Sequence, residues 1–551
     1  MANISIYGSH NAALTIEEDG KILVVIEVER FAGYKNAGIA QYKVIHNTEA
    51  VLREILFWIY HQYGFASFDT CYYANTQIVH DEVVWQMHKY IPANKYVAML
   101  HHEAHANGTF YQSPFERALI FSFDGGGNDG KFNIFEATRE TGAVCVDKIK
   151  NPKENSDHVQ YDLGFPYMIF GHYMTDIKQE FIGDGNLVYP GKLMGLASYG
   201  KVNENWLPHF IDFYKNDPDG QTYLTHIETL GNQIGIRFDV NNRLSLDDAW
   251  DVAATSQRAF EECFLEYAKP HMDRLPDWPI CITGGCGLNI LLNTRLVEEF
   301  KKTVFVGPNP NDCGISAGMM LTALKPAHPV DLTYAGLPIL DIGLLGQYFS
   351  EIPNVKRIVD EIDPEHPRFS QLESHRIIDE LLSGKIVGVM RGRSEHGPRA
   401  LGNRSILCDP SYPDMKNILN SKVKRREWYR PFAPVVRLED VNKFFEWDRD
   451  SRWMSFCPVV REEWRDKLPS ITHVDNTSRV QTVTKQDNPW LYNLLTAMNE
   501  RTGIGVLLNT SFNINGRPIT TTLRDAFTLY HNSDIDAMII EDYYISKQEI
   551  V

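Results

Sequence analysis

The sequence predicts an α/β protein with two large domains, and three observations lead to this prediction. Its 551 residues exceed the roughly 250–300 residues that one hydrophobic core can organise. Apolar, strand-like runs repeatedly end in a glycine turn that leads into a helical stretch, which is the order of α/β units. Acidic charge is unevenly distributed, because residues 1–345 carry 26 Lys and Arg against 42 Asp and Glu, whereas residues 346–551 carry 28 against 29.

The first domain is expected to open on a group of strands. Ile4–Tyr7, Ala12–Glu17 and Ile22–Glu29 have strand-like composition, and Asp19–Gly20 is a typical hairpin turn between the last two. Later strands are expected at residues 118–130 and 132–137. Near the end of this domain, residues 279–302 and 303–324 each read as a strand, a turn and a helix.

The second domain is expected to be another α/β unit. Residues 325–338 contain three prolines and read as a connector, and we place the domain boundary near residue 345. Strands are expected within residues 385–392, 503–513 and 536–545, with helical segments between them.

The whole-chain properties exclude several classes of protein. The formal net charge of −17 argues against a protein that coats nucleic acid through a basic surface. The first residues lack the features of a signal peptide, and no apolar run reaches membrane-spanning length, so we expect a soluble cytoplasmic protein without membrane contact. The eight cysteines show no close pair at metal-ligand spacing, and we expect reduced, mostly buried thiols.

Three glycine turns follow strands of the first domain, at Gly8, at Gly125–Gly127 and at Gly284–Gly287. They resemble the phosphate-1, phosphate-2 and adenosine turns of the actin-like ATPase fold. Glycine lets backbone N–H groups approach phosphate oxygens closely, so these turns indicate a nucleotide site.

The segment HHEAHA places His101 and His105 four residues apart, on one face of an expected helix, where both imidazoles can reach one cation. Asp124 and Asp312 lie on phosphate-type turns and would complete a set of two histidines and two carboxylates, which suits iron, manganese or zinc. A histidine pair of this kind also occurs as a surface or core feature. His10 follows the first glycine turn. It is interpreted either as a general base or as a histidine that only forms hydrogen bonds within the turn.

Cationic turns mark the second domain. Residues 391–437 contain eleven Lys and Arg but only four Asp and Glu, interleaved with Gly, Pro and aromatic residues. Several guanidinium groups that converge can neutralise a polyanion, so we interpret these turns as a phosphate site. A structural salt-bridge network is the competing interpretation.

Together the motifs closely resemble the O-carbamoyltransferases of nodulation-factor and antibiotic biosynthesis. The resemblance spans almost the whole chain and rests on GSHNAA, HHEAHA, FSFDGGG, GKLMGLASYG, TGGCGLN, NPNDCGISAG, HGPRALGNRSIL, REWYRPFAP and NTSFNINGRPI. It implies an actin-like domain, with a duplicated ribonuclease-H-like core, in residues 1–345. It further implies an α/β domain in residues 346–551 that is similar to the enzymes forming threonylcarbamoyl-adenylate.

The resemblance also implies a reaction. The second domain would convert carbamoyl phosphate and ATP into carbamoyl-AMP, with Mg²⁺ accompanying ATP, and the first domain would transfer the carbamoyl group to a hydroxyl acceptor. His101, His105, Asp124 and Asp312 match the family's metal ligands, usually iron, and His10 matches its catalytic base.

Further positions match nucleotide and phosphate contacts of the family. Those of the first domain are Lys35, Gly125, Gly126, Gly284, Gly285 and Asn289; those of the second domain are Arg399, Lys424, Arg430, Arg479 and Ser511.

Two positions depart from the family pattern: His396 stands where Phe is expected, and Asn476 stands where Gly is usual. The acceptor is left open between a sugar, a natural-product alcohol and a hydroxymethylated pyrimidine in DNA, the one role in which nucleic acid enters. The motifs are also compatible with a tRNA-modifying threonylcarbamoyl transferase, or with an actin-fold ATPase or binding module that has no transfer activity. The sequence leaves the oligomeric state open, and a homodimer is suggested only by the general frequency of such assemblies.

Overall fold

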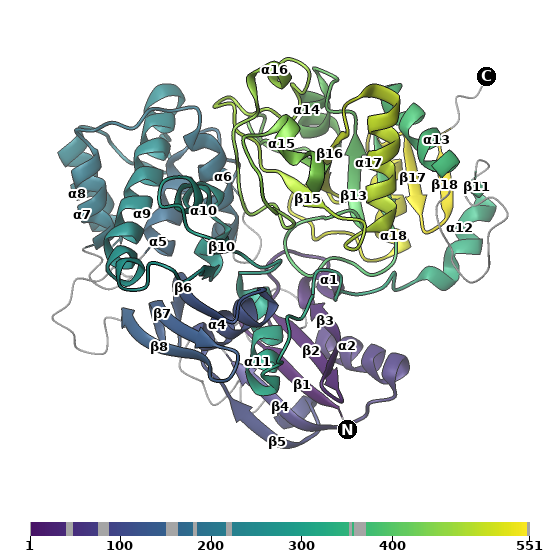
Figure 1. Cartoon of the computed structure of the whole chain (residues 1–551), viewed down its shortest axis with the longest axis horizontal. Coiled ribbons are helices and arrows are strands. Elements are labelled where there is room, and N and C mark those ends of the chain that lie inside the picture. Colours follow the sequence, from purple (N-terminus) through teal and green to yellow (C-terminus); the bar gives the residue numbers. More distant parts are fainter. Residues whose placement is uncertain are drawn as a thin grey trace. The chain divides into compact units, whose positions relative to one another are not determined.

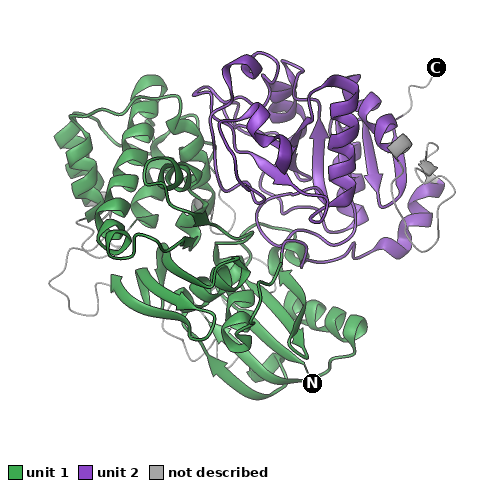
Figure 2. Cartoon of the chain, viewed as in Figure 1, with its two compact units in different colours: residues 1–332 green, residues 333–551 purple. Residues whose placement is uncertain are grey.

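A computed structural model of the chain describes residues 2–39, 48–74, 88–149, 163–179, 185–215, 223–351, 355–357 and 371–547. The chain divides into two compact units, residues 1–332 and 333–551 (Figure 2). Each unit combines helices with β-sheet, which confirms the predicted α/β class (Figure 1).

The division between the units falls earlier than residue 345, where the sequence analysis placed it. The physical reason is that residues after 332 are hydrogen-bonded within the second unit. The backbone N–H of His396 donates to the carbonyl of Thr333 (2.9 Å), and the N–H of Leu340 donates to the carbonyl of Thr521 (3.2 Å). The end of the expected connector is therefore part of the second unit.

Unit 1 contains two five-stranded sheets with the same internal order. They run β3-β2-β1-β4-β5 and β8-β7-β6-β9-β10. In both, the first three strands along the chain are antiparallel neighbours, and the last two join in parallel. This duplication confirms the actin-like arrangement. The strands are β1 (Asn3–Tyr7), β2 (Ala13–Glu18), β3 (Lys21–Glu27), β4 (Phe68–Ala74), β5 (Ala93–Ala98), β6 (Arg117–Gly127), β7 (Gly130–Thr138), β8 (Gly142–Ile149), β9 (Ile280–Thr283) and β10 (Val304–Phe305).

The hairpin between β2 and β3 forms where the sequence predicts it. Asp19 and Gly20 have φ angles of 52° and 80°, the two positive values that a tight two-residue hairpin turn requires. Strand β3 ends at Glu27 rather than Glu29, because the chain enters the short helix α1 (Val28–Ala32) there.

The helices of unit 1 include two that pack closely beside the sheets, α4 (His101–Gln112) and α11 (Ile315–Leu324). The longest helix in the described part of unit 1 is α9 (Leu246–Arg274), with 29 residues. No helix in the described ranges is both long and apolar enough to cross a membrane. The remaining helices and 3₁₀ turns are α2 (Thr48–Tyr63), α5 (Gly164–Ile169), Phe170–Tyr173, Gly185–Val188, α6 (Tyr189–Ala197), α7 (Leu207–Lys215), α8 (Tyr223–Ile234), α9 (Leu246–Arg274), Gly285–Leu288, α10 (Ile290–Glu298) and Asp312–Gly314.

Unit 2 is built on one mixed sheet with the order β11-β18-β17-β12-β13-β16-β14-β15. One strand was expected within residues 536–545, but the structure has two antiparallel strands there. The chain reverses between them at Glu541, whose φ is 47°. The strands are β11 (Val355–Arg357), β12 (Val387–Met390), β13 (Arg404–Cys408), β14 (Ala433–Arg437), β15 (Gln481–Val483), β16 (Val506–Ser511), β17 (Ala537–Ile540) and β18 (Tyr543–Ser546).

The core of unit 2 lies between this sheet and two helices, α13 (Gln371–Leu382) and α17 (Pro489–Thr502), whose buried leucines pack on strand residues such as Val389 and Leu507. None of the eight cysteines, all within the described ranges, forms a disulfide, and six of them are buried. The other helices and turns are Ile342–Leu344, α12 (Leu345–Glu351), α14 (Met415–Ile418), a π-helical turn Leu419–Val423, Leu438–Asp440, α15 (Val441–Phe444), α16 (Glu462–Arg465) and α18 (Leu523–His531).

Candidate active site

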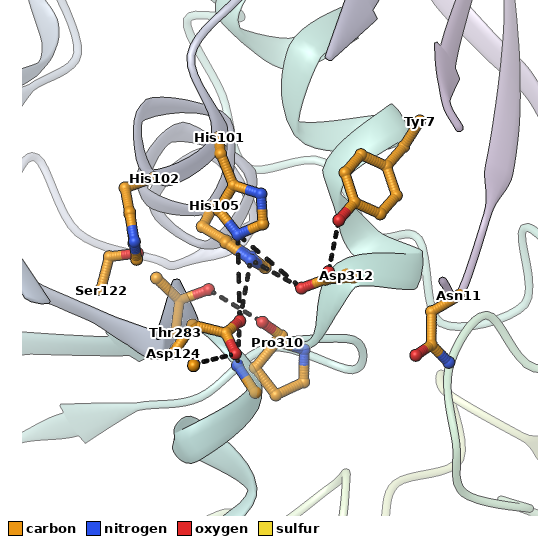
Figure 3. A network of polar contacts seen from close by, with 12 residues as sticks. Tyr7, Asn11, His101, His102, His105, Ser122, Asp124, Thr283, Pro310 and Asp312 are labelled. Carbon is orange, nitrogen blue, oxygen red and sulfur yellow. Dashed lines mark hydrogen bonds and ion pairs between the residues drawn. The ribbon is translucent and has the colours of Figure 1, made fainter. Parts of the chain in front are cut away.

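Two histidines and two aspartates from three distant segments meet in unit 1. His101 and His105 lie one turn apart on α4, Asp124 lies near the end of β6, and Asp312 opens the turn before α11. Their potential ligand atoms lie within 4.8 Å of one another. Figure 3 shows both imidazoles directed at the two carboxylates, with Nε2-to-oxygen distances of 3.4–3.9 Å.

This cluster fits a divalent transition metal. Ligand atoms about 2.1 Å from one ion lie roughly 3–4 Å apart, as these atoms do. The Nε2 atoms of His101 and His105 are buried and make no hydrogen bond with any described residue, which is costly for polar atoms unless a ligand fills the space. Two nitrogens with two carboxylate oxygens suit iron, manganese or zinc better than calcium.

The start of helix α4 is fixed by side chains from the loop that follows Asp124. Asn128 Oδ1 accepts a hydrogen bond from the backbone N–H of His101, and Asp129 Oδ1 accepts one from His102 (both 2.9 Å). Leu100, at the N-cap position, makes no such bond with its own side chain. The loop therefore caps the helix and ties the histidine pair to the segment of Asp124.

Close packing of α4 against α11 brings Asp312 to the histidines. A Cβ atom on Gly318 would lie 2.1 Å from the carbonyl oxygen of Ala104, and one on Gly108 would lie 3.0 Å from the Cα of Gly318. Only glycine permits this approach of two helix backbones. Gly127 plays a similar part, since a Cβ there would lie 2.7 Å from the His101 ring.

The charges of the cluster are strongly coupled. Burial disfavours the charged form of His105, but Asp124 and Asp312 outweigh burial and raise the pKa of His105 to about 9. Burial alone would raise the pKa of Asp124, but the two imidazoles hold that pKa well below its usual range.

The neighbouring His102 has a structural role instead. Its ring nitrogens contact Ser122 Oγ (2.8 Å) and the Gly130 carbonyl (3.0 Å), and burial lowers the pKa of His102 to about 4, so this histidine is neutral.

Asp312 is shared between the metal-ligand cluster and the first glycine turn. Its Oδ1 faces the two ligand histidines, whereas its Oδ2 accepts a hydrogen bond of 2.5 Å from the buried hydroxyl of Tyr7. The Nδ1 of His10 lies 3.5 Å from the same Oδ2 and 3.2 Å from Asn11 Oδ1. The expected base therefore lies beside the cluster. Tyr7 was not singled out from the sequence, since a lone tyrosine in a strand carries no local signal.

The second and third glycine turns converge on Asp124. Its Oδ1 accepts from the N–H of Gly125 (2.7 Å), and its Oδ2 accepts from the N–H of Gly285 (2.9 Å). Gly284 has a φ of 86°, and a Cβ there would lie 2.1 Å from the Phe123 carbonyl, so the turn requires glycine. Gly126, with a φ of 150°, has no atom within 4 Å of where its Cβ would be.

The other two expected nucleotide contacts have protein partners. The Asn289 side chain accepts from Leu292 N–H, which caps α10, and it exchanges two hydrogen bonds of 3.0 Å with Gln257. Lys35 acts electrostatically on Glu29, whose pKa is raised by burial and lowered in part by Arg30 and Lys35.

Unit 2 contains a group of three arginines, two of which have no anionic partner among the described residues. Arg399 and Arg479 make no hydrogen bond or ion pair with any residue in the described ranges, and the Nε atom of Arg479 is fully buried. Burial and the nearby Arg430 lower the pKa of Arg399 to about 10. Burial, Arg399 and Arg430 hold the pKa of Arg479 well below its usual range. Arg430 has one weak ion pair, with Glu427 at 3.5 Å.

Lys424 and Ser511 are held together by one turn. The ammonium of Lys424 donates to the carbonyl of Ser511 (2.5 Å) and to the carbonyl and side-chain oxygens of Asn513 (2.8 and 2.7 Å). Asn513 Oδ1 also accepts from the Ser511 hydroxyl (2.6 Å). Asn513, which the sequence analysis did not single out, thus fixes both residues.

The two residues that depart from the family pattern, Asn476 and His396, lie in different structural environments. Asn476 has a φ of 63°, in the left-handed region that asparagine tolerates best after glycine, so it can replace glycine there. His396 is almost fully buried, where an aromatic ring of similar size was expected.

Comparison with known proteins identifies matches to both units. Residues 2–321 match the family model described as Carbamoyltransferase N-terminus, and residues 378–547 match the one described as Carbamoyltransferase C-terminus. Nodulation protein NolO of Bradyrhizobium diazoefficiens is 32% identical over 468 residues, which cover 82% of this chain and 79% of that protein. The 3'-hydroxymethylcephem-O-carbamoyltransferase of Amycolatopsis lactamdurans is 35% identical over 299 residues, which cover 54% of each chain.

Solved structures share only a distant likeness. The HypF protein of T. kodakarensis has a TM-score of 0.38 at 11% identity, and the match covers 59% of this chain and 47% of that one. The ADPNP-bound activator of 2-hydroxyisocaproyl-CoA dehydratase from Clostridium difficile has a TM-score of 0.34 at 12% identity, and the match covers 65% of this chain and 100% of that one. These scores are too low to support a functional argument.

Proposed function

This chain belongs to the carbamoyltransferase family, and from that membership we propose that it is an ATP-dependent O-carbamoyltransferase working in two steps. Unit 2 makes carbamoyl-AMP, and unit 1 transfers its carbamoyl group to a hydroxyl. The observation that best supports the proposal is the pair of guanidinium groups, Arg399 and Arg479, that lack any described partner. Both substrates of the first step are phosphates, the ligands that such groups bind most strongly.

The activation step consumes one water. Water releases phosphate from carbamoyl phosphate, and an oxygen of the resulting carbamate attacks the α-phosphorus of ATP. The bond from that phosphorus to the oxygen bridging the β-phosphate breaks, and pyrophosphate leaves. In this proposal Arg399, Lys424, Arg430, Arg479 and Ser511 hold carbamoyl phosphate and ATP. The cations among them neutralise the negative charge on the departing phosphates.

In the transfer step, we propose that His10 acts as the general base. Its Nδ1 faces two oxygen atoms, from Asn11 and Asp312, which favours a proton on Nδ1 and leaves Nε2 basic. The acceptor oxygen attacks the carbamoyl carbon as its proton passes to Nε2, and the bond from that carbon to the AMP oxygen breaks. A divalent metal held by the cluster of His101, His105, Asp124 and Asp312, iron by family resemblance, would supply charge that polarises the adenylate.

The acceptor that we propose is an alcohol of a sugar or natural product. One relative is named for a hydroxymethyl group on a cephem, and others are named as nodulation proteins. The net charge of −17 disfavours DNA, whose binding depends on basic surface.

The activation step can be tested without knowing the acceptor. Purified protein would be incubated with ATP, Mg²⁺ and radiolabelled carbamoyl phosphate, and pyrophosphate and labelled carbamoyl-AMP would be measured. Arg399→Ala should stop both products, whereas Arg449→Ala, which removes an exposed arginine paired with Asp448, should stop neither. Conversion of ATP to ADP alone, or equal activity in the two variants, would count against the proposal.

A further inference from the structure

Glu395 lies in the loop between β12 and β13, the loop that carries Arg399. Its side chain is almost fully buried. Its Oε1 accepts hydrogen bonds from three backbone N–H groups, those of Leu401 (2.7 Å), Asn403 (2.8 Å) and Arg404 (3.2 Å). Burial of a carboxylate is costly unless its charge is compensated, and these three donors compensate it. The backbone that follows Arg399 is therefore folded around the Glu395 carboxylate.

Two further side chains hold the carbonyl of Leu401. The hydroxyl of Tyr334 donates to this carbonyl (3.0 Å), and so does Nε2 of the buried Gln481 (3.1 Å). Tyr334 belongs to the segment that the sequence predicts to be a connector, and Gln481 is the first residue of β15. Both backbone polar groups of Leu401 are thus fixed by side chains, two residues after Arg399.

The Arg399 guanidinium makes no hydrogen bond or ion pair with any residue that the structure describes. Burial and the nearby Arg430 lower the pKa of Arg399 to about 10, so the group is charged at neutral pH and lies near another cation. Because no described side chain holds this guanidinium, its position depends on the backbone from which it projects. A displacement of about 1 Å at a binding group can cost about a hundredfold in rate, so a fixed backbone matters here.

We propose that Glu395 is a positioning residue of the activation step, whose carboxylate fixes the turn after Arg399 and so directs the Arg399 guanidinium at a phosphate group. The inference rests on the proposed function, which assigns Arg399 to carbamoyl phosphate and ATP. Glu395 touches neither substrate in this role. It needs an acceptor oxygen at the reach of a glutamate side chain, because a side chain one methylene group shorter cannot meet all three N–H groups from the same backbone position.

The test is a double-mutant cycle on the full-length protein, with inorganic pyrophosphate as the probe and calorimetry as the measurement. Glu395→Asp keeps the charge and shortens the side chain by one methylene group. We expect this variant to bind pyrophosphate about tenfold more weakly, which is the effect of losing one hydrogen bond to a charged group. In the Arg399→Ala background the same substitution should cause no further loss, because the effect of Glu395 passes through Arg399.

The matched control is Asp409→Glu, which also changes the length of a buried carboxylate and keeps its charge. Asp409 follows the other end of β13 and binds the backbone N–H and the hydroxyl of Ser411 (both 2.8 Å), so this variant should bind pyrophosphate as the wild type does. Tyr334→Phe removes the hydroxyl that holds the Leu401 carbonyl and retains the ring, and it should weaken binding in the same way but less. If Glu395→Asp does not fold, normal pyrophosphate binding in Tyr334→Phe would overturn the proposal.

Three results would contradict the role of Glu395. The first is unchanged pyrophosphate binding in folded Glu395→Asp, and the second is an equal loss of affinity in the wild-type and Arg399→Ala backgrounds. The third is equal weakening in Asp409→Glu, since any disturbance of the sheet would then have the same effect. Absence of pyrophosphate binding in the wild type would overturn the inference as well, because Arg399 would then bind no phosphate.

The outcomes also separate this inference from the proposed function. If the wild type forms no carbamoyl-AMP, but Glu395→Asp weakens pyrophosphate binding only when Arg399 is present, the proposed function fails and the positioning role stands. If the wild type forms carbamoyl-AMP but the cycle shows no coupling between Glu395 and Arg399, the proposed function stands and the inference is wrong.

Discussion

Replacement of Tyr7 by phenylalanine should weaken metal binding in unit 1. The fully buried Tyr7 hydroxyl donates a 2.5 Å hydrogen bond to Asp312 Oδ2, which leaves Oδ1 facing His101 and His105. A hydrogen bond to a charged group contributes about 1.5–3 kcal/mol. Loss of a group that orients a metal ligand typically costs about tenfold to a hundredfold in affinity, or about 1.4–2.7 kcal/mol. The two estimates agree, so we expect a loss of affinity in this range.

The assay is calorimetric titration of metal-depleted protein with Mn²⁺, for wild type and variants. Tyr214→Phe is the matched control, since Tyr214 is equally buried and hydrogen-bonds Ser256 Oγ (2.8 Å) in the same unit, away from the cluster. It should bind Mn²⁺ as the wild type does. If Tyr7→Phe also binds Mn²⁺ as tightly as the wild type, Tyr7 does not orient Asp312, and the reasoning is refuted. Equal weakening in both variants would indicate a general loss of stability instead.

Two further predictions concern stability. Gly318→Ala places a methyl group 2.1 Å from the Ala104 carbonyl oxygen, so helices α4 and α11 must separate. We expect the free energy of unfolding to fall by roughly 1–3 kcal/mol and Mn²⁺ binding to weaken. Unchanged values in denaturant and metal titrations would contradict this packing. Burial alone would raise the pKa of Asp475, but hydrogen bonds and charge from His473 and Thr477 outweigh burial and hold this pKa well below its usual range. The Asp475 carboxylate therefore stabilises the folded state above about pH 4 and loses this effect as the pH falls. In urea titrations, Asp475→Asn should have a lower free energy of unfolding than the wild type at pH 7, and this difference should narrow towards about pH 3. A difference in free energy that does not change with pH would argue against this role of Asp475.

Strands and glycine turns could be predicted because their signals are local. The β2–β3 hairpin, for example, follows from Asp19–Gly20, whose two positive φ angles the sequence already suggests. The reversal at Glu541 was missed, because a non-glycine residue with positive φ gives little warning of a turn. The early division between the units was missed because it depends on hydrogen bonds between Thr333 and a loop far along the chain.

The candidate sites show a similar limit. The four-residue spacing of His101 and His105 is visible in the sequence, but their approach to Asp312 depends on helix packing through Gly318. The residues that orient the sites, such as Tyr7 and Asn513, act through hydrogen bonds with residues far away in the sequence. No periodicity or motif reports such a bond, so these residues became visible only in the folded chain.

The central claim is that the two units divide the reaction, and pyrophosphate release without acceptor tests it most directly. His105→Ala and Arg399→Ala would be compared with the wild type in the presence of ATP, Mg²⁺ and carbamoyl phosphate. The division predicts that Arg399→Ala lowers the rate by about a hundredfold or more, whereas His105→Ala, which removes a metal ligand of unit 1, forms pyrophosphate and carbamoyl-AMP at nearly the wild-type rate. Loss of pyrophosphate release in His105→Ala, with full activity in Arg399→Ala, would contradict it.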